Sequence, residues 1–235
     1  MKQTMILFKI GLKQISKDGM LIILIPAPFL AGVFFKFAVP FLNHILTAKY
    51  QFPITAWYGL ADGMMICLTP MFTAMISAFL LLEEWDEGLS AFYQITPAEG
   101  YSYLSARIGI PMIWAFAATI TVSFLLNLSS LSLQIIFLSS IISSFTGISL
   151  AMMVASIAGN RVEGLALSKM MGLSFIGLIL VWFVPAPYHY FMAFLPSFWI
   201  GKLLADGADF FTFLLGVSTC SIWTALFTKR FLKRV

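Results

Sequence analysis

The sequence has few charged residues. Of its 235 residues only 10% are Asp, Glu, Lys or Arg, whereas 60% are hydrophobic, and the mean hydropathy is +0.96. Soluble domains carry about 25% charged residues, because a water-exposed surface must be polar. This chain cannot cover a globule with polar groups. Its composition therefore excludes an ordinary soluble domain and predicts a membrane protein.

Cysteine is scarce as well, and phosphate-binding loops are missing. Cys67 and Cys220 both lie in apolar runs, and their spacing matches neither a disulfide framework nor a zinc site. We interpret them as small packing residues. No Gly-x-x-x-x-Gly-Lys-Ser/Thr sequence occurs. We therefore expect no cofactor in this chain, and if the protein works against a gradient, ATP is hydrolysed by another chain.

What is present is a series of long apolar runs. A hydrocarbon core of about 30 Å requires roughly 20 residues of helix, and six segments reach or nearly reach that length. They are residues 20–41, 57–82, 108–126, 133–158, 165–184 and 210–228. The sequence shows no internal repeat and no soluble segment of domain size. It predicts one all-α membrane domain of six transmembrane helices over residues 1–235.

The positions of the basic residues predict the orientation. Eleven lysines and arginines lie in the N-terminal segment, the connections after spans two and four, and the C-terminal segment. Only Lys49 and Lys202 lie on the opposite side. Basic connections stay in the cytoplasm, so we expect a plasma-membrane protein with both termini cytoplasmic. The net charge is +4, but the basic residues flank apolar runs and do not form a basic stripe. This distribution argues against nucleic-acid binding.

The first residues, 1–19, have the pattern of a helix lying on the membrane surface. Met5, Phe8, Leu12 and Ile15 recur at helical spacing, and the lysines at positions 2, 9, 13 and 17 share the opposite face. Such a helix buries its apolar side in the membrane interface and offers its lysines to anionic lipids. The alternative is a frayed basic leader.

Residues 185–209 form the long external connection between spans five and six. The segment begins Pro-Ala-Pro and is rich in aromatic residues, which favour positions between water and lipid. We predict a re-entrant or interfacial helix pair broken at Pro196. The alternative is an aromatic belt with no specific ligand.

Two charged residues lie inside predicted spans. Lys36 is near the outer end of span one, and Asp62 is in the first turns of span two. Charges in apolar spans are costly and usually mark function or a buried pair. We expect an ion pair between them near the external mouth. The alternative is that Lys36 reaches the interface while Asp62 is solvated.

Residues 83–107 form the long cytoplasmic connection, and it begins with an acidic cluster. Glu83, Glu84, Asp86 and Glu87 end span two, where neither the helix dipole nor the cytoplasmic side favours negative charge. We infer that a basic surface of a cytoplasmic protein would complement them. Gly88 is suited to end this helix, and the Thr96-Pro97 pair to begin a short one. The alternative is a solvated loop.

This segment resembles the signature of the type-2 ABC exporter permeases. The residues that carry the resemblance are Glu84-Trp85-Asp86-Glu87-Gly88, then Thr96-Pro97, Tyr103 and Arg107. Trp85 stands where the family commonly has Arg. The layout of the whole chain is also similar to that family, nearest to its fluoroquinolone or multidrug export branch.

The resemblance implies a permease that moves a hydrophobic or amphipathic compound out of the cell. Such permeases form a homodimer or pair with a similar permease, above two cytoplasmic ATPase subunits that bind ATP and Mg²⁺. The connection after span two supplies the coupling helix. The implied coupling residues are Glu84, Asp86, Glu87, Gly88, Thr96 and Pro97.

Two other function classes fit parts of the sequence. The Glu83-Glu84 pair resembles that of CAAX-type intramembrane proteases, but Gly88 stands where they have Arg. The two histidines, His44 and His189, are expected on the opposite side of the membrane, away from these glutamates. Bound zinc would favour such an enzyme. A membrane immunity or scaffold protein without turnover is the third class, and a neighbouring ATPase gene would argue against it.

Overall fold

The computed structural model describes residues 2–88 and 100–233, and within them every regular element is helical. The longer helices are α1 (Lys2–Ile15), α2 (Gly19–Leu24), α3 (Ala27–Tyr50), α4 (Tyr58–Asp86), α7 (Ile110–Leu126), α8 (Leu133–Ile157), α9 (Arg161–Met170), α10 (Ile176–Phe183), α11 (Pro196–Asp206) and α12 (Phe210–Leu232). Short helical turns are η1 (Thr55–Trp57), α6 (Gly100–Leu104), η2 (Ser105–Gly109), η3 (Met171–Phe175) and η4 (Tyr188–Met192).

The six predicted spans are confirmed. Six helical stretches are long and apolar enough to cross a membrane: Ala27–Tyr50, Thr55–Asp86, Ser102–Leu126, Leu133–Ile157, Arg161–Phe183 and Phe210–Leu232. The protein is therefore a multi-pass membrane protein. The first span lies further along the chain than the predicted residues 20–41, because α2 and α3 are separated at Pro26, which has no N–H to continue the first helix.

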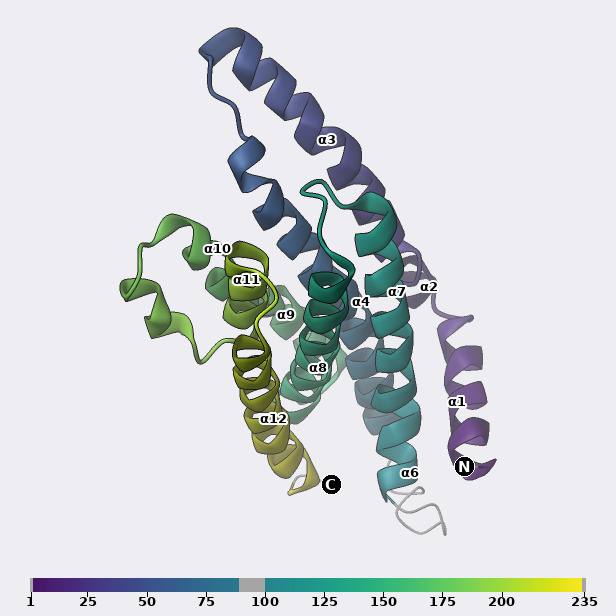
Figure 1. Cartoon of the computed structure of the whole chain (residues 1–235). Helices are drawn as coiled ribbons and strands as arrows, with labels where there is room; N and C mark the ends of the chain where they lie inside the picture. The colour runs from purple at the N-terminus through teal and green to yellow at the C-terminus, as the bar shows by residue number, and fades with distance from the viewer. Residues whose placement is uncertain (1, 89–99, 234–235) are drawn as a thin grey trace.

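Helices α4 and α8 form the centre of the bundle. In the most apolar window of each span, 78% of α4 and 61% of α8 is buried, against 6% for α3 and 11% for α12. Figure 1 shows α3 and α12 on opposite sides of this central pair. Gly147 of α8 permits the close crossing, because a Cβ there would press against Pro70 of α4.

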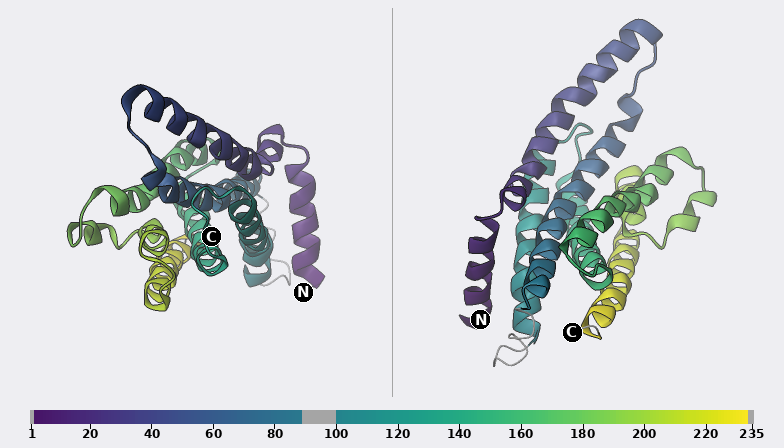
Figure 2. Two further views of the ribbon diagram at one scale, coloured as in Figure 1. Left: turned by 45° about the horizontal axis from the view of Figure 1, so that its top comes forward. Right: turned by 180° about the vertical axis from the view of Figure 1, so that it is seen from behind.

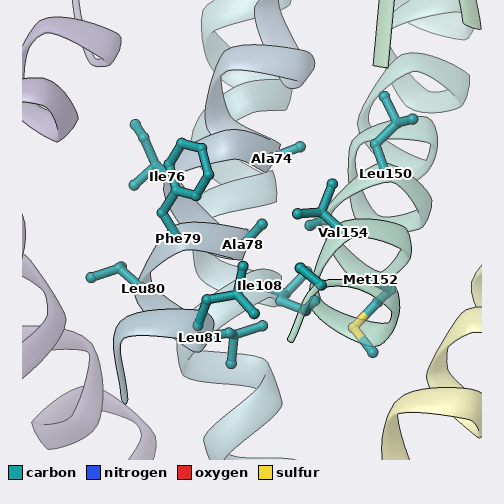
Figure 3. Packing of buried hydrophobic residues seen from close by; sticks show 14 of the residues in the cluster. Ala74, Ile76, Ala78, Phe79, Leu80, Leu81, Ile108, Leu150, Met152 and Val154 are labelled. Atoms are coloured by element: carbon teal, nitrogen blue, oxygen red, sulfur yellow. The ribbon is translucent and has the colours of Figure 1, made fainter. Parts of the chain in front are cut away.

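The core consists of two clusters, one toward each end of the bundle. Figure 3 shows the first, in which Ala74 and Ala78 of α4 lie beside Leu150 and Val154 of α8. The second surrounds Leu178 and includes buried residues of α11. The described ends of α1 and α12 lie at one end of the bundle (Figure 1; Figure 2). We call this end the terminal face; the distribution of basic residues predicts that it is cytoplasmic.

The connection between spans five and six turns back into the bundle, as the sequence predicts. Helix α11 begins at Pro196 and packs against α10, α8 and α12. Ser197 donates a hydrogen bond to the carbonyl of Ser174, which precedes α10. The start of α11 thus lies beside the middle of span five. Phe198 and Trp199 are buried here, whereas Tyr188, Tyr190, Phe191 and Phe194 are exposed, as an aromatic belt requires.

Candidate functional site

The acidic end of α4 meets two arginines at the terminal face. Both arginines follow α4 in the chain, Arg107 in η2 and Arg161 as the first residue of α9. Between them they hold Glu83, Glu84 and Asp86. The acidic cluster is therefore complemented largely from within the chain.

Glu84 and Arg107 form a buried, two-pronged ion pair. Their side chains are 0% and 1% exposed. The Arg107 Nε donates to Glu84 Oε2 at 3.0 Å, and Arg107 Nη2 donates to Oε1. The Tyr103 hydroxyl donates to the same Oε2 at 2.7 Å. Removal of one partner of such a pair would cost about 3–5 kcal/mol, because the other charge would remain buried.

Arg107 also fixes the N-terminal helix. Its Nη1 donates to the carbonyl of Leu7 at 2.9 Å, across 100 residues of sequence. Gly11, one turn further along α1, makes room for the guanidinium, because a Cβ at that position would overlap Arg107. Arg107 lies in a π-helical turn, a distortion that often occurs at functional positions. One side chain thus joins α1, the end of α4 and the start of span three.

Arg161 makes a second junction about the same helix end. Its guanidinium pairs with Asp18 and, at 3.4 Å, with Glu83. Its backbone N–H donates to Asp86 Oδ2 at 2.9 Å. Asp18 is itself the cap of α2. The hydrogen bond from Arg161 holds the pKa of Asp18 below its ordinary value, with help from the two capping N–H groups and against partial burial.

The structure changes the interpretation of the predicted coupling residues. Glu84 is buried and bonded to Arg107, so it does not offer its charge to a docking protein. Asp86 is exposed but already accepts from Arg161. Glu87 and Gly88 are exposed, and Gly88 has a φ of +70°, as expected for a residue that ends a helix. Thr96 and Pro97 lie outside the described residues.

The N-terminal helix has a second, protein-facing side that the sequence pattern did not predict. Leu7, Gly11 and Ile15 face the protein, one turn apart, whereas Met5 and Leu12 are exposed. Helix α1 contacts α4, α6 and η2. The helix is amphipathic, but Arg107 and α4 cover the face opposite its lysines. The sequence pattern could not separate this inner face from one that lipid covers.

Lys36 and Asp62 both bond the turn between α7 and α8, but they do not form an ion pair with each other. Lys36 Nζ donates to the carbonyl of Asn127 at 2.7 Å. Asp62, which is 1% exposed, accepts from the backbone N–H groups of Leu128 and Ser129, both at 2.8 Å. The four ion pairs found in residues 2–88 and 100–233 join other side chains. The two charges anchor the connection between α7 and α8 rather than forming the expected direct pair.

The glutamate pair does not have the surroundings of a metalloprotease. Glu83 and Glu84 face Arg161 and Arg107. His189 lies in η4, between α10 and α11, and its Nδ1 bonds the carbonyl of Val184 at 3.0 Å. Within the described part of the chain no group of three His, Cys, Asp or Glu side chains converges. Cys67 and Cys220 are buried free thiols.

The sequence analysis missed Arg107 and Arg161 as partners of the acidic cluster. Arg161 was counted only as a basic residue of a cytoplasmic connection, and Arg107 also as part of the permease signature, but neither was paired with an acidic residue. One signal was available: Arg107 lies directly before an apolar span, where an unpaired charge is costly. That position predicts a partner at similar depth, and the end of span two provides one.

Comparison with known proteins gives consistent matches over most of the chain. Residues 11–229 match a family described as fluoroquinolones export permease protein Rv2686c-like. Two curated Mycobacterium tuberculosis proteins are each 23% identical over 208 residues, which is 85% of this chain and 82% of theirs. They are fluoroquinolones export permease proteins, MT2760 of strain CDC 1551 / Oshkosh and Rv2686c of strain ATCC 25618 / H37Rv. No solved structure matches significantly.

Proposed function

This chain belongs to the Rv2686c-like export permease family, and we propose that it is the membrane subunit of an ATP-driven exporter whose ATPase is a separate protein. The six apolar helices suit a transport subunit. The substrate that we propose is an amphipathic aromatic compound of the fluoroquinolone kind, because the two curated relatives are named for fluoroquinolone export. ATP and Mg²⁺ would be bound by the partner.

The observation that carries this proposal is the arrangement of arginines around the end of α4. Arg107 and Arg161 connect this end to α1, α2, span three and α9. A protein that pushes on the exposed tip at Glu87 and Gly88 would therefore move several helices together. The buried pair of Arg107 and Glu84 transmits such a push best, because separating its charges is costly. The contacts at the tip and the internal ion pairs have different roles: the tip receives the ATPase, and the pairs carry its motion.

The outer helices suit a second permease subunit. Helices α3 and α12 are the least buried spans, and they carry many large exposed apolar side chains, among them Phe34 and Phe37 on α3 and Phe210 and Phe211 on α12. Lipid covers such surfaces in a monomer, and another membrane helix packs on them equally well. We propose a homodimer, or a pair with a similar permease, in which at least one of these helices is covered.

Co-purification tests the proposed ATPase. The tagged protein is isolated in mild detergent, and a soluble partner that hydrolyses ATP is sought at one-to-one stoichiometry. Glu87→Lys is expected to weaken the association, since Glu87 is exposed at the tip. Lys49→Glu reverses an exposed charge at the opposite face and serves as the control.

Two outcomes would count against the exporter. If no ATPase co-purifies with a folded protein, a membrane protein without turnover becomes the better proposal. If an ATPase binds Glu87→Lys and the unchanged protein equally well, the tip is not its docking site. Stoichiometric zinc in the purified protein would instead revive the metalloprotease alternative.

A further inference from the structure

A long apolar pocket lies between α8, α9, α11 and α12. Its volume is about 300 Å³, at the lower end of the range for small-molecule sites. Along α8 its lining runs from Thr146 to Ile157, which is about 16 Å at the rise of an α-helix. At its inner end stand Leu195 and Pro196, where the re-entrant helix begins.

The polar groups of the lining are already bonded. The Thr146 hydroxyl donates to the carbonyl of Ile142 at 2.8 Å, and the Ser174 hydroxyl to that of Met171 at 2.6 Å. Ser149 bonds Thr224 at 2.8 Å. Among the described residues, those that line the pocket include no charged one. An ionised group would lose its water here without a new partner, so the part of a ligand that is bound must be apolar.

The shape and chemistry of the wall favour a flat aromatic ring. Trp223 and Phe227 stack with ring centroids 5.4 Å apart and planes at 23°. The Trp223 indole N–H donates to the carbonyl of Phe194 at 2.7 Å, so the indole offers only its ring to the pocket. Met153 and Met170 add polarizable thioethers to the wall, and sulfur contacts aromatic rings favourably.

The pocket opens away from the centre of the bundle. Met170 and Leu173 at its rim are 53% and 54% exposed. They lie on span five, which has 28% of its apolar window buried, against 78% for α4. A compound dissolved in the lipid therefore reaches the pocket directly, without crossing the packed interface between α4 and α8.

We propose that this pocket binds the flat apolar ring of an aromatic amphiphile that arrives from the lipid, with the charged groups of that molecule remaining outside the rim. The proposal rests on the exporter function for its substrate class. What is new is the location of the binding site, which lies within one subunit on the outer side of span five. Binding there requires neither ATP nor the ATPase.

Equilibrium binding of norfloxacin to the full chain in lipid nanodiscs tests the pocket, with the fluorescence anisotropy of the drug as the readout and empty nanodiscs as the blank. Leu173→Trp fills the pocket from its rim and is expected to weaken binding at least tenfold. Leu165→Trp is the matched control, because Leu165 is 43% exposed nearby but does not line the pocket; its affinity should stay within twofold. Met170→Trp is a second filling variant, used if Leu173→Trp does not fold.

The outcomes separate the pocket from the exporter. Equal affinity of the filled and control variants would overturn the pocket as the binding site. Native mass spectrometry that shows one phospholipid lost from Leu173→Trp, at unchanged norfloxacin affinity, would assign the pocket to an acyl chain and also overturn the proposal. Selective loss of norfloxacin binding supports the pocket even if no ATPase is found, in which case only the exporter function fails.

Discussion

The guanidinium of Arg107 is paired with the carboxylate of Glu84, and both side chains are buried. Two N–H groups of the arginine bond the two carboxylate oxygens, and a third bonds the backbone of Leu7. The pair therefore belongs to the fold and to the proposed coupling path at once. Its loss should be visible first as loss of stability.

Arg107→Ala should lower the free energy of unfolding by about 3–5 kcal/mol, because the Glu84 carboxylate would stay buried without its partner. Glu87→Gln, which alters an exposed acid of the same segment, should change it by less than about 0.5 kcal/mol. Denaturant unfolding in detergent measures both. Equal stability of the two variants would contradict the buried pair.

Gly11→Ala should loosen α1 from the bundle, because its methyl group would overlap the Arg107 guanidinium. Amide hydrogens of α1 would then exchange faster, and hydrogen exchange with mass spectrometry detects this. Gly19→Ala is the control, since a Cβ at Gly19 meets nothing within 4 Å. If both variants leave exchange in α1 unchanged, α1 is not held in the way that the structure shows.

The contact between Asp18 and Arg161 should make stability depend on pH in the acid range. The pKa of Asp18 is lower in the folded protein than its ordinary value of 3.8, so the contact stabilises fully above that value. The stability is lost as the pH falls through the lower, folded-state pKa. Asp18→Asn removes the charge but keeps a good helix cap.

Unfolding of the unchanged protein and of Asp18→Asn between pH 7 and pH 3 measures this dependence. The unchanged protein should be the more stable at pH 7, and the difference should narrow toward pH 3. A difference that stays constant over this range would show that the charge of Asp18 does not contribute.

Lys36→Met and Asp62→Asn should each destabilise the protein, by about 1–3 kcal/mol, because each removes a charged hydrogen bond to the turn between α7 and α8. The double variant should be less stable than either single variant. If the two side chains instead formed one ion pair, the second substitution would cost almost nothing after the first. A double-mutant cycle decides between these outcomes.

Hydropathy and local signals predicted the layout of the chain but not its internal partners. The apolar runs located six spans, and Pro196 located the start of α11, because both signals depend on neighbouring residues. The partners of Glu84 and Asp18 lie 23 and 143 residues away. No periodicity encodes such pairs. The sequence analysis therefore assigned the charge of Glu84 to a partner protein, although folding buries it against Arg107.

The inner face of α1 was missed for a related reason. Leu7, Gly11 and Ile15 form a stripe only when the glycine is counted as a contact residue. A hydrophobic pattern gives a glycine no weight. Its role becomes visible only when the space above it is occupied, here by Arg107.

The long sequence separation of these contacts also orders the biosynthesis of the protein. Glu84 leaves the ribosome before Arg107, and Asp18 leaves it long before Arg161. The end of α4 cannot therefore reach its buried state until span three has begun to emerge, since its carboxylate must stay hydrated until then. The N-terminal segment, made first, reaches its final contacts only when α9 has been synthesised. A nascent chain arrested between spans three and five would hold Asp18 still open to water.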